Sequence, residues 1–326
     1  MSAQAPDRVI LHSVLDFGII APSRDGASVL RDAFEFAKVA EQSGYAAFWV
    51  AEHHEAHFAW GAPAVVMAAL GQCTTHIRLG AAAILLPLYS PLAVAESFRT
   101  LAALYPGRID LGVCAGVPED AVALRALSSI HSSEMGAISE TFAQKLPDLA
   151  AFLRGGFEPG HRFALGATPQ HALPPALWVM GSSERAARRA AAHGAHFGYS
   201  LFHRGSKQDP AVAFAFRDAC QARAEGFHGR LKIAATCICA DTEEAADEQV
   251  KRVEHWLKND LRIVVSGTPR QCHEQIAALI ERYDADEMML FHLWHEQEPR
   301  LEAVRALADA FQLAPDDLER NHIYAP

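Results

Sequence analysis

The sequence predicts an α/β protein of the (β/α)8 class, the TIM barrel. Eight short apolar runs of strand-forming residues occur along the chain, and most of them are followed by a stretch with helical spacing. From the second run to the fourth the repeat is about thirty residues, which is the length of a βαβ unit. An open, doubly wound sheet is the alternative. It would need a G-x-G-x-x-G turn after its first strand, and the sequence has none there.

The expected strands are residues 13–17, 46–52, 77–86, 109–114, 177–180, 196–202, 232–239 and 288–293. The expected helices are residues 28–43, 62–75, 92–104, 138–153, an Ala/Arg-rich stretch ending at Gly194, 210–225, 242–259, 269–283 and 297–312. The alternation is interrupted by residues 117–176 and by a short apolar run at 263–265. Insertions are therefore expected after strands four and seven, and a chain longer than the roughly 250 residues of a typical barrel has room for both. We expect a single domain over residues 1–326.

The composition argues against several classes of protein. The net charge of −10 disfavours non-specific binding to nucleic acid. No apolar run approaches ~18 residues, so no membrane span is expected. The first eight residues lack the basic-then-apolar order of a signal peptide. The six cysteines are scattered without C-x-x-C spacing, which is typical of reduced thiols in a cytoplasmic protein.

Residues 48–54, Phe-Trp-Val-Ala-Glu-His-His, change abruptly from apolar to polar. A buried parallel strand whose C-terminal end opens into a polar site has this pattern, and in a β/α barrel that end carries the chemistry. Glu52, His53, His54 and His57 could also suggest a metal site. Neighbouring residues of a strand point to opposite faces, however, so His53 and His54 are not expected to share one ion. We predict no metal site.

Four stretches, in the right order along the chain, resemble the bacterial luciferase-like flavin-dependent monooxygenases. They are residues 49–54, 80–87, 107–114 and 178–183. The resemblance implies a TIM barrel that binds reduced FMN, reacts it with O2 and oxygenates a small organic substrate. It also implies a separate flavin reductase as the source of FMNH2, because the chain carries no second nucleotide-binding motif. We further expect a homodimer.

The resemblance places several residues around the flavin ring. His53 matches the family's catalytic histidine, an acid or base, and Glu52 either orients it or is a buried structural carboxylate. Cys114 matches a cysteine that luciferase-type members place near the C4a edge of the flavin, although it could be a small buried residue. Ala82 and Ala83 offer backbone without side-chain bulk to a flat ring, or close packing of strand against helix. Family members carry a non-proline cis peptide at this position, so the Ala82–Ala83 bond is expected to be cis.

A second group of residues is expected to bind the FMN phosphate. Gly181, Ser182 and Ser183 open a helix and supply hydroxyl and N–H groups, which could also form an ordinary N-cap. Arg185, one turn into the helix, could add a charge-assisted contact. Many members follow the fourth strand with an arginine that binds the phosphate, and here that residue is Ala115. We therefore expect weaker FMN binding than in members that have the arginine.

The substrate is expected to be fairly apolar, because aromatic and polar side chains stand at other strand ends. These candidate pocket residues are Phe17, Trp60, Tyr89, Tyr199, Phe202, His203, Phe291 and Trp294. We expect about a third of them to line the pocket, because aromatic side chains at the rim of a barrel often only cap the core. Two alternative functions remain open. One is a deazaflavin-dependent oxidoreductase that transfers hydride on the same barrel, and the other is a non-catalytic flavin-binding partner subunit.

Overall fold

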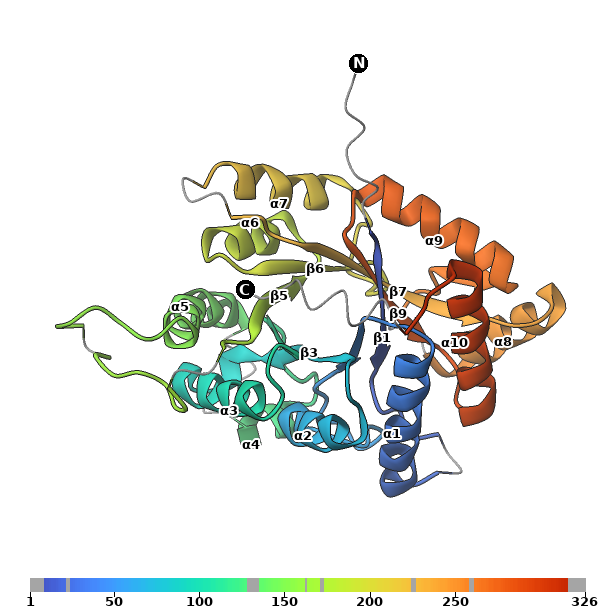
Figure 1. The fold of residues 1–326 in the computed structure, drawn as a ribbon, viewed down its shortest axis with the longest axis horizontal. Helices are drawn as coiled ribbons and strands as arrows, with labels where there is room; N and C mark the ends of the chain where they lie inside the picture. The colour runs from blue at the N-terminus through green and yellow to red at the C-terminus, as the bar shows by residue number, and fades with distance from the viewer. Residues whose placement is uncertain are drawn as a thin grey trace, which may run out of the picture.

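Eight parallel strands close into a barrel in the computed structural model, which describes residues 9–21, 24–127, 135–161, 163–170, 173–223, 227–257 and 261–315 (Figure 1). The barrel strands are β1 (Leu11–Asp16), β2 (Ala47–Val50), β3 (Arg78–Leu85), β4 (Ile109–Cys114), β5 (Ala176–Gly181), β6 (His196–Ser200), β7 (Leu231–Cys239) and β9 (Glu287–His292). Each strand pairs in parallel with the next, and β9 pairs with both β7 and β1, which closes the ring. The predicted TIM barrel is confirmed, and the open sheet is excluded.

Helices surround the barrel, as Figure 1 shows. They are α1 (Gly26–Gln42), α2 (Pro63–Cys73), α3 (Pro91–Leu104), α6 (Glu184–Ala192), α7 (Ala211–Gln221), α8 (Glu243–Leu257), α9 (Pro269–Tyr283) and α10 (Gln297–Phe311). Of the described helices, none is long and apolar enough to cross a bilayer. The last two residues of the predicted helices at 210–225 and 242–259, which are 224–225 and 258–259, lie outside the described residues.

Both predicted insertions are present. The connection from β4 to β5 contains α4 (Ala121–Leu127) and α5 (Met135–Leu153), and the connection from β7 to β9 contains α8, β8 (Val265–Gly267) and α9. The apolar run predicted at 263–265 leads into β8, which pairs with the last residues of β7 and takes no part in closing the ring. Helix α4 was not predicted. It is only seven residues long, and its single buried side chain, Leu124, gives no apolar period to detect.

Strand alternation divides the core into two parts. Phe48 and Val50 of β2 face the helices, whereas Trp49 and Ala51 face the inside of the barrel. The indole of Trp49 requires a glycine on the neighbouring strand, because a Cβ on Gly80 would lie 2.2 Å from it. Large side chains therefore fill the barrel interior, and any opening for a ligand has to lie at one end.

Charged side chains fill the N-terminal end of the barrel interior. Arg78 and Asp110 form a bidentate pair at 2.9 and 2.7 Å, and the Trp178 indole N–H donates to Asp110 at 3.0 Å. Burial alone would raise the pKa of Asp110, but the Arg78 guanidinium outweighs it and holds that pKa at about 2. No pattern in the sequence pointed to this network.

A buried ion pair completes this end of the barrel. Lys232 Nζ lies 2.8 Å from Glu287 Oε1 and 3.3 Å from the centre of the Trp49 ring. Burial lowers the pKa of Lys232 to about 8, although Glu287 opposes the shift. With the N-terminal end filled in this way, a ligand is expected at the C-terminal end, as in other barrels of this class.

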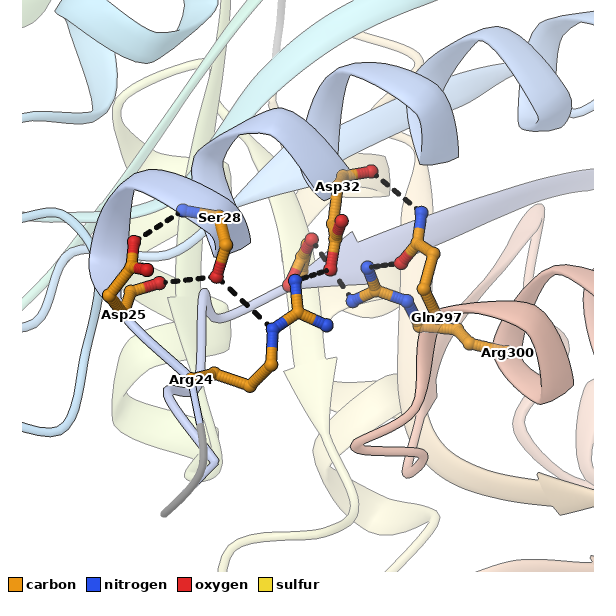
Figure 2. A network of polar contacts seen from close by, with 7 residues as sticks. Arg24, Asp25, Ser28, Asp32, Gln297 and Arg300 are labelled. Carbon is orange, nitrogen blue, oxygen red and sulfur yellow. Dashed lines mark hydrogen bonds and ion pairs between the residues drawn. The ribbon is translucent and has the colours of Figure 1, made fainter.

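The opposite end of β1 is tied to two helices by a network of polar contacts (Figure 2). Arg24 pairs with Asp32 of α1 at 2.6 Å, and the Gln297 side chain donates to the Asp32 carbonyl at 2.9 Å. Arg300 of α10 donates to Gln297 and, at 3.3 Å, to Asp16 at the end of β1. The residue after Asp16 points into the barrel, so this network fixes the strand end that carries Phe17.

Candidate active site

Two cavities open at the C-terminal end of the barrel. The first, about 780 Å³, lies at the last residues of β4, β5 and β6 and is called here the β4–β6 cavity. The second, about 720 Å³, is lined by Glu52, His53 and His54 just after β2 and is called the β2 cavity. Phe17 and His203 line both cavities, which are therefore neighbours. Each has the size of a ligand pocket.

The predicted cofactor-binding residues come together in the β4–β6 cavity. Its lining includes Ala82, Ala83, Cys114, Gly181, Ser182, Ser183 and Arg185. The Ala82–Ala83 peptide bond is cis, as predicted. Ala115, which replaces the family arginine, lines the same cavity. Residues from the ends of three strands, distant in the sequence, thus line one cavity. Their positions in the sequence alone could not predict that they meet.

His53 stands in an apolar setting in the β2 cavity. Its ring stacks on Phe58, with ring centres 4.0 Å apart, and lies 4.8 Å from the ring of Phe17. Burial lowers the pKa of His53 to about 4, although Glu55, 3.8 Å from Nδ1, opposes the shift. The imidazole is therefore neutral at neutral pH and able to accept a proton rather than to donate one.

The expectation that Glu52 orients His53 is wrong. The Glu52 carboxylate lies 2.8 Å from His54 Nε2 and accepts hydrogen bonds from the Tyr89 hydroxyl at 2.6 Å and the Leu85 N–H at 3.0 Å. The physical reason is strand-like alternation, because residues two apart share a side and adjacent residues do not. Glu52 is thus a buried carboxylate that orients His54.

Cys114 is the last residue of β4, and its sulfur accepts a hydrogen bond from the Gly116 N–H at 3.4 Å. Burial raises the pKa of the Cys114 thiol to about 11. At neutral pH the residue is therefore a thiol and a poor nucleophile.

This protonation state gives a testable prediction. We expect Cys114 to react with iodoacetamide at pH 7 about 10²-fold more slowly than an ordinary cysteine, with a rate that rises roughly tenfold per pH unit up to pH 10. Peptide mass spectrometry resolves Cys114 from the other cysteines, and urea-unfolded protein is the control, because unfolding removes the burial. Rapid labelling of the folded protein at pH 7 would contradict the assignment.

The start of α6 borders the β4–β6 cavity. The Ser183 hydroxyl accepts a hydrogen bond from the Ala186 N–H at 3.3 Å and so caps its own helix. Ser182 and Arg185 line the cavity beside it. The N-terminus of the helix adds a partial positive charge at this wall, as in many anion sites. The two interpretations of Ser183 are therefore compatible, since it caps the helix and lies at the cavity.

Two cations in the β4–β6 cavity were missed by the sequence analysis. Arg189 and Lys207 both line it, together with the carboxylates of Glu184 and Asp209. Arg189 follows Arg185 by one helical turn, and this i, i+4 spacing was the available signal. The spacing predicts a shared face but not that the face borders a cavity. For Lys207, which follows β6, no comparable pattern was available in the sequence.

The aromatic pocket candidates divide into two groups. Phe17, Phe202 and His203 line the cavities. The others do not line either one: Trp60, Tyr89, Tyr199, Phe291 and Trp294. Trp60 packs against Gly18 and donates to the Ala51 carbonyl at 2.9 Å, for example, so it supports the strand end from behind. Phe291 stacks on Phe17 at 4.3 Å and so holds a cavity residue in place. Three of the eight candidates thus line a cavity, and the other five line neither.

The fold is a β/α barrel with two cavities at the C-terminal ends of its strands, which is where enzymes of this fold carry their active sites. Among the described side chains no group of His, Cys, Asp and Glu could hold a metal ion. The family model for luciferase-like monooxygenases matches residues 14–263. The chain therefore belongs to the luciferase-like, flavin-dependent monooxygenase family.

Individual relatives agree with this assignment. The N-acetyl-S-alkylcysteine monooxygenase of Bacillus subtilis is 32% identical over 83% of this chain and 81% of its own length. The oxygenase component of the flavin-dependent trigonelline monooxygenase of Acinetobacter baylyi is 21% identical, over 76% and 71%. These are proteins that the chain is similar to, and their substrates are their own.

Solved structures share the fold. The structure of apo-MsnO8 superimposes with a TM-score of 0.81 at 28% identity, over 94% of this chain and all (100%) of the other. The oxygenating constituent of 3,6-diketocamphane monooxygenase from Pseudomonas putida, in complex with FMN, gives a TM-score of 0.72 at 17% identity, over 94% and 98%. At that identity the second likeness concerns the fold alone.

Proposed function

We propose that the protein is an FMN-dependent monooxygenase in which FMNH2 binds in the β4–β6 cavity and a small organic substrate binds in the adjoining β2 cavity. The observation that carries the proposal is the adjacency of two cavities with different chemistry. One has cationic side chains and a helix N-terminus suited to a phosphate, and the other presents a neutral imidazole, His53. Family membership supports the proposal.

The residues of the β4–β6 cavity fit FMN in two regions. Arg185, Arg189 and Lys207, with the start of α6, would hold the phosphate. The Ala82–Ala83 backbone and Cys114 would lie along the ring, where small side chains leave room. The bound reduced flavin would supply the electrons that activate O2. His53, neutral at pH 7, would accept a proton from the substrate side of the site.

A separate flavin reductase is part of the proposal, as the name of the related trigonelline oxygenase component suggests. We also propose that the protein is cytoplasmic and forms a homodimer. Size-exclusion chromatography with light scattering would test the dimer.

The experiment that tests the function is anaerobic titration with FMNH2, followed by oxygen in a stopped-flow instrument. We expect a flavin species that decays faster with substrate, with consumption of O2. A preference for reduced deazaflavin and turnover without oxygen would contradict the proposal.

Arg189 provides a prediction for cofactor binding. A guanidinium bound to a phosphate contributes about 1.5–3 kcal/mol, so Arg189→Ala is expected to weaken FMN binding about 10- to 100-fold. Calorimetry with FMN measures the dissociation constant. Arg31→Ala, at an exposed position of α1, is the matched control and is expected to bind like the unmodified protein.

A second substitution in the same cavity is expected to restore FMN binding. Since Ala115 also lines it, Ala115→Arg is expected to restore the affinity lost in Arg189→Ala and to tighten binding by the unmodified protein. Unchanged FMN binding in Arg189→Ala, together with no gain from Ala115→Arg, would show that the phosphate lies elsewhere.

A further inference from the structure

The β2 cavity has a charge opposite to that of its neighbour. We propose that it selects substrates with an apolar body and a protonated amino group, and that it disfavours anionic substrates of the same shape. This inference rests on the proposed function, in which the β2 cavity holds the substrate. It specifies the substrate class that the sequence analysis described only as fairly apolar.

Much of the cavity lining is apolar. Its lining includes Phe17, Ile19, Ile20, Phe58, Leu85, Val117 and Leu261. The ring of Phe58 is stacked against His53, and Phe17 is held by its own stacking on Phe291. These fixed aromatic and aliphatic walls would bury a hydrocarbon or aromatic body, and an aromatic face also attracts a nearby cation.

Three carboxylates line the same space, from two strand ends: Glu52, Glu55 and Glu119. Glu52 is buried and already has three hydrogen-bond partners, so it contributes mainly charge to the cavity. Glu55 accepts a hydrogen bond from the His54 N–H at 3.1 Å, and its side chain is 24% exposed. Glu119 is exposed, in the connection after β4. Even if the Glu52–His54 pair is counted as neutral, Glu55 and Glu119 remain.

The described lining contains little to neutralise this charge. No Lys or Arg is found among the described side chains that line the cavity. Burial lowers the pKa of His53, His203 and His295, so these imidazoles are neutral at neutral pH and do not offset the carboxylates. The other two lining histidines are His54, which is paired with Glu52, and His57, which is exposed. An anion placed there would meet carboxylates and, among the described side chains, no Lys or Arg to pair with, whereas an ammonium group would meet carboxylates and aromatic faces.

The β4–β6 cavity shows the contrast. It is lined by Arg185, Arg189 and Lys207 against two carboxylates, Glu184 and Asp209, and by the N-terminus of α6. The two neighbouring spaces therefore sort charged ligands, with anionic groups drawn to one and cationic groups to the other. A substrate with a basic nitrogen would also be kept from the phosphate site.

The test uses three probes with one aromatic body: 2-phenylethylamine, 2-phenylethanol and 3-phenylpropanoate. Calorimetry at pH 7 and low salt measures their binding to the full chain. We expect the amine to bind at least tenfold more tightly than the carboxylate, a difference of about 1.4 kcal/mol, with the alcohol between them. The ratio should fall at high salt, because the carboxylates at the rim are screened.

Two variants locate the effect. Glu55→Gln and Glu119→Gln keep the shape of the side chain and remove its charge, so each is expected to lower the amine-to-carboxylate ratio about three- to tenfold. Glu244→Gln, at an exposed position of α8, is the matched control and should leave the ratio unchanged.

The outcomes separate the two proposals. Equal binding of amine and carboxylate, tighter binding of the carboxylate, no measurable binding of any probe, or a ratio that both glutamate variants leave unchanged would each overturn this inference. FMN binding and O2 consumption are measured independently of the probes. If FMN fails to bind while the amine preference and its loss in the variants persist, the proposed cofactor function is wrong, and the charge selectivity of the cavity stands.

Discussion

His53→Ala is expected to reduce the rate of substrate oxygenation by about 10²–10⁴-fold while leaving FMN binding nearly unchanged. The range is the usual contribution of a positioned acid or base. FMN binding should be spared because His53 lines the β2 cavity and does not line the β4–β6 cavity, where FMN is proposed to bind. The measurement is product formation with a flavin reductase and substrate, with FMN affinity by calorimetry on the same preparation.

The pH dependence distinguishes a base from a structural imidazole. With a pKa of about 4, His53 is in its proton-accepting form throughout the neutral range and is lost as a base only when the pH falls towards 4. Oxygenation is therefore expected to decline on the acid side, and His53→Ala to remove that limb. His255→Ala, at an exposed position of α8, is the control. Unchanged turnover in His53→Ala would make the residue structural.

Asp110→Asn is expected to lower the free energy of unfolding by about 3–5 kcal/mol, the usual cost of breaking a buried ion pair from one side. The change leaves the Arg78 guanidinium without its charged partner in the barrel interior, where it is only 14% exposed. It also weakens the acceptor of the Trp178 indole. Urea unfolding followed by tryptophan fluorescence or circular dichroism measures the loss.

Acid sensitivity provides a second measurement of the same network. The pKa of Asp110 in the folded protein, about 2, is below the value of about 3.9 expected for the unfolded chain. Its contribution to stability is therefore complete above the unfolded pKa and is lost as the pH falls through 4 towards 2. Asp110→Asn should flatten that part of the stability curve. Asp218→Asn, exposed on α7, should not, and an equal loss in both variants would contradict the assignment.

The sequence by itself determined the fold. Each predicted barrel strand overlaps an observed one, because a strand buried on both faces is a continuous apolar run with helical stretches on either side. The cis peptide at Ala82–Ala83 was predicted correctly as well. Family resemblance placed it, and the periodicity of the sequence could not have done so.

What the tertiary structure alone decided is which side chains share a space. Because side chains alternate in direction after β2, Glu52 contacts His54, whereas the ring of His53 stacks on Phe58. The pairing of β4, β5 and β6 brings Arg189 and Lys207 to the cavity of Ala115, although Ala115 lies far before both in the chain. The physical reason is that local patterns record which face of an element is apolar, whereas the environment of a polar side chain depends on elements that join it only on folding.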